Sequence, residues 1–201
     1  MNLWLVIPVK PFCEAKTRLA GALSSQERAD LMRELLTGVL AQVRESGLLA
    51  GTVVISRDEA VLDLARDLGA RALHETGAGL NAALDEARDM IMARGADGML
   101  VLPADLPLLT VDDILQLYDL ALSDVEVAIA PSHDGGTNAL LLCPPDAMGF
   151  AFGPDSFRRH VQQALSTGHR YAIYRSETLG QDVDMPGDLV LLLSKGVGSC
   201  V

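Results

Sequence analysis

The sequence lacks the features that mark membrane, secreted and nucleic-acid-binding proteins. Its 201 residues contain no apolar run near the roughly 20 residues that a membrane-spanning helix needs. No basic segment precedes the apolar residues 3–7, so no signal peptide is expected. The formal net charge of -11 argues against a nucleic-acid-binding surface. We therefore expect a cytoplasmic protein with neither a membrane nor a nucleic acid as partner.

Cysteines and familiar catalytic signatures are also scarce. Cys13, Cys143 and Cys200 are odd in number and widely spaced, which fits neither a disulfide framework nor a zinc site. The chain has neither a P-loop nor a G-x-G-x-x-G fingerprint. It also shows no Ser-His-Asp or Cys-His arrangement that would indicate a protein nucleophile. Cys13 is interpreted as incidental, and a reducing compartment is expected.

What is present indicates one compact domain. The hydrophobic fraction of 49% and the charged fraction of 21% are those of a globular protein. The length suits one domain with a proper core, and no repeat, low-complexity segment or linker interrupts it. We expect a single domain over residues 1–195 and a loose tail over residues 196–201.

Short apolar runs recur along the chain and are typical of strands covered on both faces, as in a largely parallel sheet. They are residues 3–7, 52–56, 98–102, 125–130, 138–143 and 171–174. With helical patterns between them, the predicted order is βαβαβαβαββαβα. This order favours an α/β fold, a three-layer αβα sandwich with a mostly parallel sheet.

Local signals give the helix starts. Ser24 and Glu27 form a capping box ahead of an apolar stripe, and Pro186 suits the first turn of a last helix ending at 195. In that turn, Asp188 is expected to be exposed and to complement the helix dipole. The other helices are expected over 57–68, after Gly79, from the Thr110 cap and from Pro154.

A basic loop follows the first predicted strand. Lys10, Lys16 and Arg18 lie within nine residues of one another in an otherwise acidic protein. In open α/β sheets ligands gather beyond the carboxyl ends of the strands. The loop is therefore predicted to hold a small polyanion, with an ordinary solvated loop as the alternative.

Acidic residues follow another strand and precede the last helix. Asp105 lies between two prolines, which hold the backbone near extended geometry at the strand end. Asp182 and Asp184 are two residues apart, which in an extended segment places both side chains on one face. Carboxylates suit magnesium, which binds one or two of them together with phosphate oxygens and water. We predict a shared magnesium site, against the alternative of turn and cap residues.

Two further segments carry free backbone and side-chain donors. Residues 134–136 predict a tight turn whose N–H groups line an anion-binding concavity, and Thr137 and Asn138 follow it. Gly153 and Ser156 lie at a helix start, where free N–H groups attract phosphate or carboxylate. These segments predict a second anion site.

Two signals are weak when taken alone. Gly77, Gly79 and Asn81 lie at a helix entry, where glycine allows close approach of a flat ligand and Asn81 would read a base edge or ribose. An ordinary Gly-rich helix entry is the alternative. His160 lies on an apolar helix stripe, which favours a core histidine over a catalytic one.

Six motifs taken together resemble one family. In chain order they are P-V-K-x-x-x-x-A-K-T-R-L, G-L-N-x-A-L, L-P-A-D-L-P-L, G-G-T-N-A-L-L, F-G-P-x-S-F-x-x-H and D-V-D-x-P-x-D-L. Over residues 3 to 192 the chain resembles the 2-phospho-L-lactate guanylyltransferase family of coenzyme F-420 biosynthesis. A wider similarity extends to nucleotidyltransferases with the glycosyltransferase-A-like fold, molybdenum-cofactor enzymes included.

The resemblance implies a reaction and its ligands. GTP would donate GMP to a small phosphorylated carboxylic acid, either 2-phospho-L-lactate, phosphoenolpyruvate or 3-phosphoglycerate, and release pyrophosphate with Mg2+ as cofactor. The implied catalytic residues are Lys10, Lys16, Arg18 and Asp105, and the implied metal ligands are Asp105, Asp182 and Asp184. The implied nucleotide-binding residues are Pro8, Val9, Lys10, Gly79, Asn81, Pro103 and Ala104. The implied acceptor-binding residues are Thr137, Asn138, Gly153 and Ser156.

The resemblance also bears on partners and leaves alternatives. A transient contact with the next pathway enzyme is expected because the guanylylated product is labile, and a homodimer is compatible with the family. A molybdenum-cofactor nucleotidyltransferase would carry a Gly-rich loop after the first strand, which is absent here. A nucleotide-binding module without catalysis need not keep the three acidic residues. A glycosyltransferase would carry D-x-D where this chain has A-D-L-P.

Overall fold

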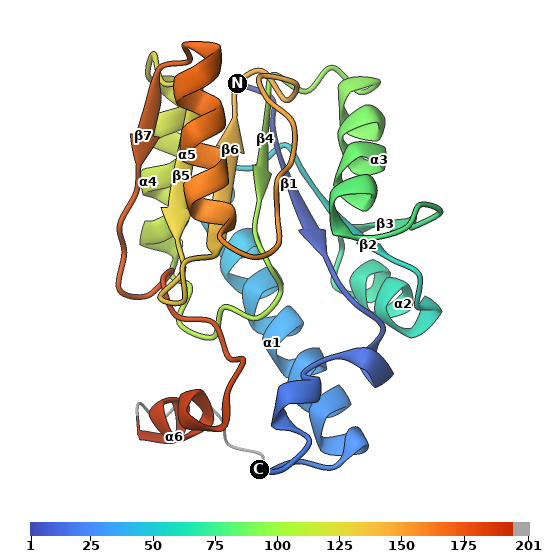
Figure 1. The fold of residues 1–201 in the computed structure, drawn as a ribbon. Helices are drawn as coiled ribbons and strands as arrows, with labels where there is room; N and C mark the ends of the chain where they lie inside the picture. Colours follow the sequence, from blue (N-terminus) through green and yellow to red (C-terminus); the bar gives the residue numbers. More distant parts are fainter. Residues whose placement is uncertain (195–201) are drawn as a thin grey trace.

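The computed structural model describes residues 1–194, with side chains described up to residue 190 (Figure 1). The predicted domain end at 195, the tail 196–201 and Cys200 lie outside the described residues. Within the described range, no helix is both long and apolar enough to cross a membrane.

Seven strands form one sheet, in the order β3-β2-β1-β4-β6-β5-β7. The strands are β1 (Leu3–Pro8), β2 (Gly51–Ser56), β3 (Arg71–His74), β4 (Gly98–Val101), β5 (Val127–Pro131), β6 (Thr137–Leu142) and β7 (Tyr171–Ile173). β6 pairs antiparallel with both β4 and β5, and all other pairs are parallel. The predicted mostly parallel sheet is confirmed.

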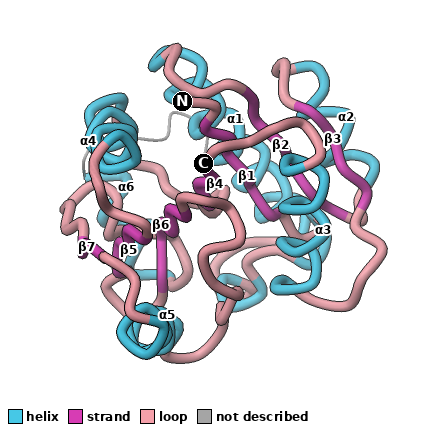
Figure 2. The backbone as a smooth tube through the Cα atoms, turned by 90° about the horizontal axis from the view of Figure 1, so that it is seen from above, coloured by secondary structure: helices cyan, strands magenta, loops and turns pink. Residues whose placement is uncertain are grey.

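Helices cover both faces of the sheet, which confirms the predicted three-layer sandwich (Figure 2). The helices are α1 (Ser25–Ser46), α2 (Glu59–Asp67), α3 (Leu80–Met92), α4 (Val111–Leu122), α5 (Ser156–Thr167) and α6 (Pro186–Ser194). Helices α1, α2 and α4 pack on one face, and α3 and α5 pack on the other. Helix α6 lies beyond the carboxyl ends of the parallel strands (Figure 1).

Strand β1 shows why its run is continuously apolar. Leu3, Leu5 and Ile7 belong to the core under α1, whereas Trp4 and Val6 belong to the core under α3. Successive side chains of a strand point to opposite faces. Because helices cover both faces, the side chains of residues 3–7 are all buried and apolar.

Most predicted helix starts are confirmed, and the exceptions have local causes. The capping boxes of Ser24 and Thr110 are both formed. The fifth helix begins at Ser156 rather than Pro154, because Asp155 adopts a left-handed backbone conformation (φ 54°) that a helix cannot include. The second begins at Glu59, because the side chain of Asp58 caps it by accepting from Ala60 N.

Candidate active site

The loops that carry the predicted site residues meet at one edge of the sheet. The carboxyl ends of β1, β2, β3 and β4 lie there because these strands are parallel. Strand β6 runs the other way, so its first residues, Thr137 and Asn138, reach the same edge from the opposite end of a strand. The reversal of β6 therefore brings the second anion-binding segment toward the first.

Three aspartates gather at this edge. Asp105, Asp182 and Asp184 each offer a carboxylate oxygen, and these oxygens lie within 4.8 Å of one another. Burial, and after it the charge of Asp105, together raise the pKa of Asp182 to about 6. Three converging carboxylates with few protein donors repel one another, so a cation between them lowers the free energy of the cluster. The predicted metal ligands thus form one group.

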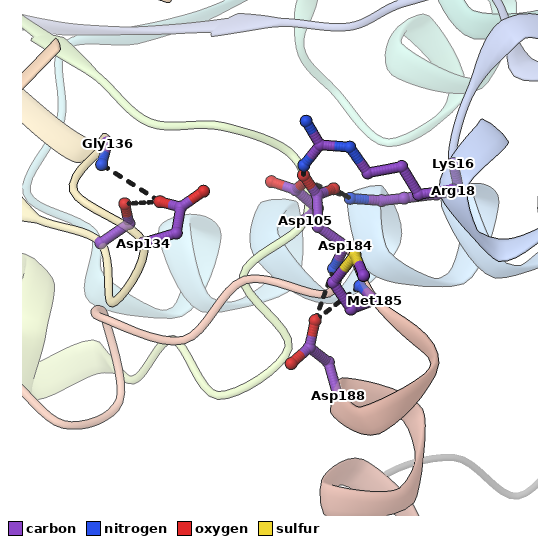
Figure 3. A network of polar contacts seen from close by, with 9 residues as sticks. Lys16, Arg18, Asp105, Asp134, Gly136, Asp184, Met185 and Asp188 are labelled. Atoms are coloured by element: carbon purple, nitrogen blue, oxygen red, sulfur yellow. Dashed lines mark hydrogen bonds and ion pairs between the residues drawn. The ribbon is translucent and has the colours of Figure 1, made fainter. Parts of the chain in front are cut away.

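Lys16 reaches into this group from the basic loop (Figure 3). Its Nζ forms ion pairs with Asp105 and, at 2.8 Å, with Oδ1 of Asp184. Only 5% of the Lys16 side chain is exposed. Burial alone would lower the pKa of Lys16, but the two carboxylates more than offset it and raise the pKa above its usual value. The cluster therefore already stabilises one cation.

The backbone of the basic loop directs Lys16 inward. Two 3-10 turns, Phe12–Glu14 and Thr17–Leu19, flank Lys16, which has a left-handed conformation (φ 53°, ψ 38°). For a residue other than glycine this conformation carries strain and is often found at functional sites. Arg18 is more exposed, and its Nη1 lies 3.4 Å from Oδ2 of Asp184.

Asp188 fixes the backbone next to the cluster. Its Oδ2 accepts the backbone N–H groups of Asp184 at 2.9 Å and Met185 at 2.7 Å (Figure 3). The prediction that Asp188 lies in the first turn of the last helix is confirmed. The expected exposure is wrong, because these two hydrogen bonds hold the side chain in a partly buried position.

A cavity of about 450 Å³ opens beside the acidic cluster. Its lining includes Lys16, Asp105 and Asp184, and most of the residues that were predicted to bind the nucleotide: Pro8, Val9, Lys10, Gly79, Pro103 and Ala104. Asn81 is not in the lining. Its amide donates to Phe152 O at 3.2 Å and accepts from Phe152 N at 2.9 Å, so it ties α3 to the loop before α5.

A buried chain of polar side chains lies under the predicted acceptor segment. His160 Nε2 accepts from Ala151 N at 3.0 Å, so the proton of the neutral ring is on Nδ1 and faces Thr137 Oγ1 at 3.0 Å. Ser156 Oγ also donates to Thr137 Oγ1, at 3.1 Å. Burial lowers the pKa of His160 to about 4, which keeps it neutral. His160 is a satisfied core histidine that orders the two hydroxyl groups.

Asn138 and Gly153 stand at the two ends of this segment. Asn138 Nδ2 donates to Leu179 O at 3.0 Å and so holds the chain shortly before Asp182. Gly153 has φ 125°, and a Cβ there would lie 3.1 Å from Nη2 of Arg159. Glycine is required at this position by the backbone conformation.

Asp113, near the start of α4, is a buried acidic residue that the sequence analysis did not single out. Asp113 is 3% exposed and accepts five hydrogen bonds. Two come from the N–H and hydroxyl of Thr110, and the others from the hydroxyl groups of Tyr174, Ser176 and Thr178. The S/T-x-x-D spacing was visible in the sequence, but the three partners lie more than 60 positions away.

Comparison with known proteins identifies the family. The sequence pattern of the family described as guanylyl transferase, CofC like, matches residues 3–200. The chain belongs to this family. It is therefore a nucleotidyltransferase. This membership bears out the resemblance drawn from the six motifs and favours it over a molybdenum-cofactor enzyme.

Individual relatives are similar over nearly the full length. The phosphoenolpyruvate guanylyltransferase of Rubrobacter xylanophilus is 42% identical over 98% of this chain and 96% of that protein. The 2-phospho-L-lactate guanylyltransferase of Methanothermobacter thermautotrophicus is 40% identical over 99% of this chain and 87% of that protein. The two names give different acceptors at almost equal similarity.

Solved structures share the fold. A putative nucleotide-diphospho-sugar transferase from Desulfovibrio desulfuricans aligns with a TM-score of 0.82 at 19% identity, covering 98% of this chain and 89% of that one. CMP:2-keto-3-deoxy-manno-octonic acid synthetase in complex with CTP aligns with a TM-score of 0.67 at 12% identity, covering 98% and 100%. The fold is the glycosyltransferase-A-like fold of nucleotidyltransferases, as expected.

Proposed function

We propose that the protein transfers GMP from GTP to a phosphorylated three-carbon carboxylic acid and releases pyrophosphate, as a step of coenzyme F-420 biosynthesis. The observation that carries this proposal is the junction of the aspartate cluster, Lys16 and the 450 Å³ cavity at one edge of the sheet. Relatives named for phosphoenolpyruvate and for 2-phospho-L-lactate support this class of acceptor; 3-phosphoglycerate is the third candidate.

The reaction needs positioning and charge neutralisation more than a protein nucleophile. A phosphate oxygen of the acceptor attacks the α-phosphorus of GTP and forms a new P–O–P linkage. The bond between the α-phosphorus and the oxygen that bridges to the β-phosphate breaks, and pyrophosphate leaves with the electron pair. The absence of a Ser-His-Asp or Cys-His pattern from the sequence agrees with this chemistry.

The donor set of the cluster fits magnesium. Asp105, Asp182 and Asp184 offer oxygen ligands only, which is the preference of this ion, and Lys16 indicates that a cation is stabilised beside them. When bound, magnesium neutralises charge that develops on the phosphate oxygens and aligns the attacking and leaving oxygens. The three aspartates would hold it.

The basic loop supplies the remaining positive charge. Lys10 and Lys16 line the cavity, and Arg18 lies beside it near Asp184. We assign these three residues to the triphosphate, where a guanidinium gives forked contacts and an ammonium a point charge. The nucleotide would also contact residues that form the cavity wall: Pro8, Val9, Gly79, Pro103 and Ala104. Asn81 would act indirectly at the guanine end: its two hydrogen bonds with the backbone of Phe152 hold the cavity wall in place.

The acceptor is assigned to the segment at the start of β6 and α5. Thr137 accepts hydrogen bonds from His160 and Ser156, so its own hydroxyl proton is left to donate to an anion. Gly153 has no side chain, so the acceptor can come close to the backbone there. Asn138 holds this segment in place by its hydrogen bond to Leu179 O.

Two partners are also proposed. The first is a transient contact with the next pathway enzyme, which accelerated flux through the two enzymes together would test. The second is a homodimer, which the molecular mass in solution would test.

The experiment is pyrophosphate release with GTP, ATP, CTP and UTP against the three acids, with and without magnesium. Release with GTP and one acid, only with magnesium, is the expected result and identifies the acceptor. Release with another nucleotide at equal rate, or release that does not need any of the acids, would contradict the proposed transfer.

A further inference from the structure

An acidic side chain faces the same cavity at a distance from the aspartate cluster. Glu75 follows directly after β3 and lines the cavity together with Arg57 and Glu14. Its carboxylate forms no hydrogen bond or ion pair with any residue in the described range 1–194. Glu14, in contrast, is paired with Arg57 Nη2 at 2.5 Å. Glu75 thus presents an unpaired acceptor to the cavity.

The backbone around Glu75 is fixed. Its N–H donates to Ser56 O at 2.9 Å, which extends the pairing of β2 with β3 by one residue. The next two residues are held from the other side, because Glu86 on α3 accepts from Thr76 N at 3.1 Å and Gly77 N at 2.5 Å. The carboxylate of Glu75 is therefore presented from a rigid loop, whereas that of Glu86 is occupied by the loop itself.

The distance along the sheet suits a nucleotide. Asp105 follows β4 and Glu75 follows β3, and the order β3-β2-β1-β4 separates them by three strand spacings, or about 14 Å. An extended nucleoside triphosphate has this order of length between its α-phosphate and the far edge of its base. With the phosphates at the aspartate cluster, the base reaches the end of the cavity where Glu75 lies.

We propose that Glu75 selects guanine by accepting two hydrogen bonds from its Watson–Crick edge. Guanine offers two adjacent donors there, N1–H and the 2-amino group, and an ionised carboxylate is a pure acceptor with two oxygens. Adenine offers an acceptor, N1, in the same place and would face the carboxylate with a lone pair. This inference rests on the proposed function, because it uses the cavity as the GTP site.

The residue beside Glu75 complements the same base. Arg57 is 54% exposed and uses Nη2 for Glu14, which leaves other guanidinium donors free for an acceptor such as guanine O6. Cytosine and uracil offer at most one donor at the ring position that faces Glu75. The pair of groups therefore matches guanine better than any other common base.

The test is Glu75→Gln, with binding of GTP, ITP, ATP and 2′-deoxy-GTP measured by calorimetry and pyrophosphate release measured in parallel. Glutamine presents one acceptor and one donor, which matches adenine. We expect GTP affinity to fall by about 10- to 100-fold, and the preference for GTP over ATP to fall by more, because ATP affinity rises. ITP lacks the 2-amino group, so it should bind the unmodified protein less tightly than GTP and the variant about as well as GTP.

Glu45→Gln is the matched control, since Glu45 is exposed on α1 and lies outside the cavity. It should leave all four affinities unchanged. If Glu75→Gln lowers the melting temperature strongly, Glu75→Asp gives the same comparison with the charge kept and the reach shortened, and GTP selectivity should again fall.

Two results would overturn the inference. GTP selectivity that Glu75→Gln leaves intact would remove the contact altogether. An equal loss for GTP, ITP and ATP, with loss of discrimination against 2′-deoxy-GTP, would assign Glu75 to the ribose instead. Absence of pyrophosphate release from the unmodified protein, with the selectivity change still seen in binding, would contradict the proposed transfer but not the role of Glu75.

Discussion

Two acidic centres at the same end of the molecule differ in their hydrogen-bond donors. Asp113 is buried, yet its pKa is lowered, because hydrogen bonds from Ser176, Thr178 and Thr110 more than offset the effect of burial. Asp182 is only partly buried, but its pKa is raised to about 6 by burial and by the charge of Asp105. No other residue of the described chain donates a hydrogen bond to Asp182. Burial alone therefore does not explain why the two pKa values shift in opposite directions. The number of hydrogen-bond donors around each carboxylate does.

The two centres are also connected. Three of the four hydroxyl groups that donate to Asp113 belong to residues 174–178. The same segment continues through Leu179, whose carbonyl oxygen accepts from Asn138 at 3.0 Å, to Asp182. The backbone of Gly180 accepts from His133 N at 3.1 Å on the way. Asp113, which accepts five hydrogen bonds from the protein, thus supports the loop that presents Asp182, which accepts none from any other described residue. We expect substitutions of Asp113 to affect mainly stability, and substitutions in the aspartate cluster to affect mainly activity.

The largest expected effect is that of Asp105→Asn. Loss of one of three clustered carboxylates should lower the rate of pyrophosphate release by about 100- to 1000-fold, or about 3 to 4 kcal/mol of transition-state stabilisation. The free energy of unfolding should change by less than about 1 kcal/mol, because Lys16 keeps its ion pair with Asp184. Turnover assays and urea unfolding measure the two. Retained activity would remove Asp105 from the chemistry.

Asp113→Asn is the converse experiment. The asparagine amide group would face hydroxyl and N–H donors, so we expect the free energy of unfolding to fall by about 3 kcal/mol. The folded fraction should keep turnover within about tenfold at saturating magnesium, but should need more magnesium for half-maximal rate, because the segment before Asp182 is loosened. Urea unfolding and a magnesium titration measure these. Unchanged stability with lost turnover would reverse the roles of the two centres.

The pH dependence of stability tests whether His160 is buried as a neutral, hydrogen-bonded ring. Its pKa is lowered from 6.5 to about 4, so above pH 6.5 the ring is neutral in both the folded and the unfolded chain. As the pH falls from 6.5 to 4, only the unfolded chain takes up the proton, and the folded state loses up to about 3 kcal/mol. Between pH 7 and pH 4.5, the free energy of unfolding should therefore decrease more in the unmodified protein than in His160→Gln. Equal slopes would contradict a buried neutral ring.

Lys16→Ala should weaken GTP binding by about tenfold while changing the KM of the acceptor by less than about twofold, because the ammonium lies at the cavity wall beside the aspartates. Binding of GTP by calorimetry and acceptor kinetics give the two values. Arg44→Ala, an exposed substitution on α1, is the control for loss of one positive charge. A larger effect on the acceptor than on GTP would reassign the basic loop.

Ser156→Ala should have the smallest effect. It removes one of the two hydrogen bonds that orient Thr137, so the KM of the acceptor should rise about three- to fivefold with little change in GTP affinity. Steady-state kinetics with each acid measure this. An unchanged acceptor KM would move the acceptor site away from the start of α5.

The sequence predicted the fold well where both faces of a strand are covered. Strand β3 had no continuous apolar run, because it is an edge strand of the sheet and its first and last residues, Arg71 and His74, are exposed. The sequence also did not predict which of β5 and β6 pairs with β4. The turn at 132–136 is short, so β5 and β6 form a hairpin, but which strand then inserts beside β4 depends on packing of the whole sheet.

The candidate site was predictable to the extent that its residues lie at strand ends. Asp105, Asp182 and Asp184 converge as expected, because carboxyl-edge loops of a parallel sheet meet. Asp113 and Glu75 were missed for different reasons. Asp113 lies three residues after the predicted Thr110 cap, and nothing local in the sequence indicates its contacts with residues 174–178. Glu75 follows a strand that gave no clear signal.

The contrast between Asp113 and the aspartate cluster is tested most directly by metal binding in the presence of GTP. Manganese serves as a paramagnetic probe for magnesium. The account predicts tight manganese binding to the unmodified protein with GTP, loss of this binding in Asp182→Asn, and its retention in the folded fraction of Asp113→Asn, with at most a weaker affinity. Equal binding by Asp182→Asn and the unmodified protein would contradict the claim that Asp182, the carboxylate without a donor from another described residue, binds the ion.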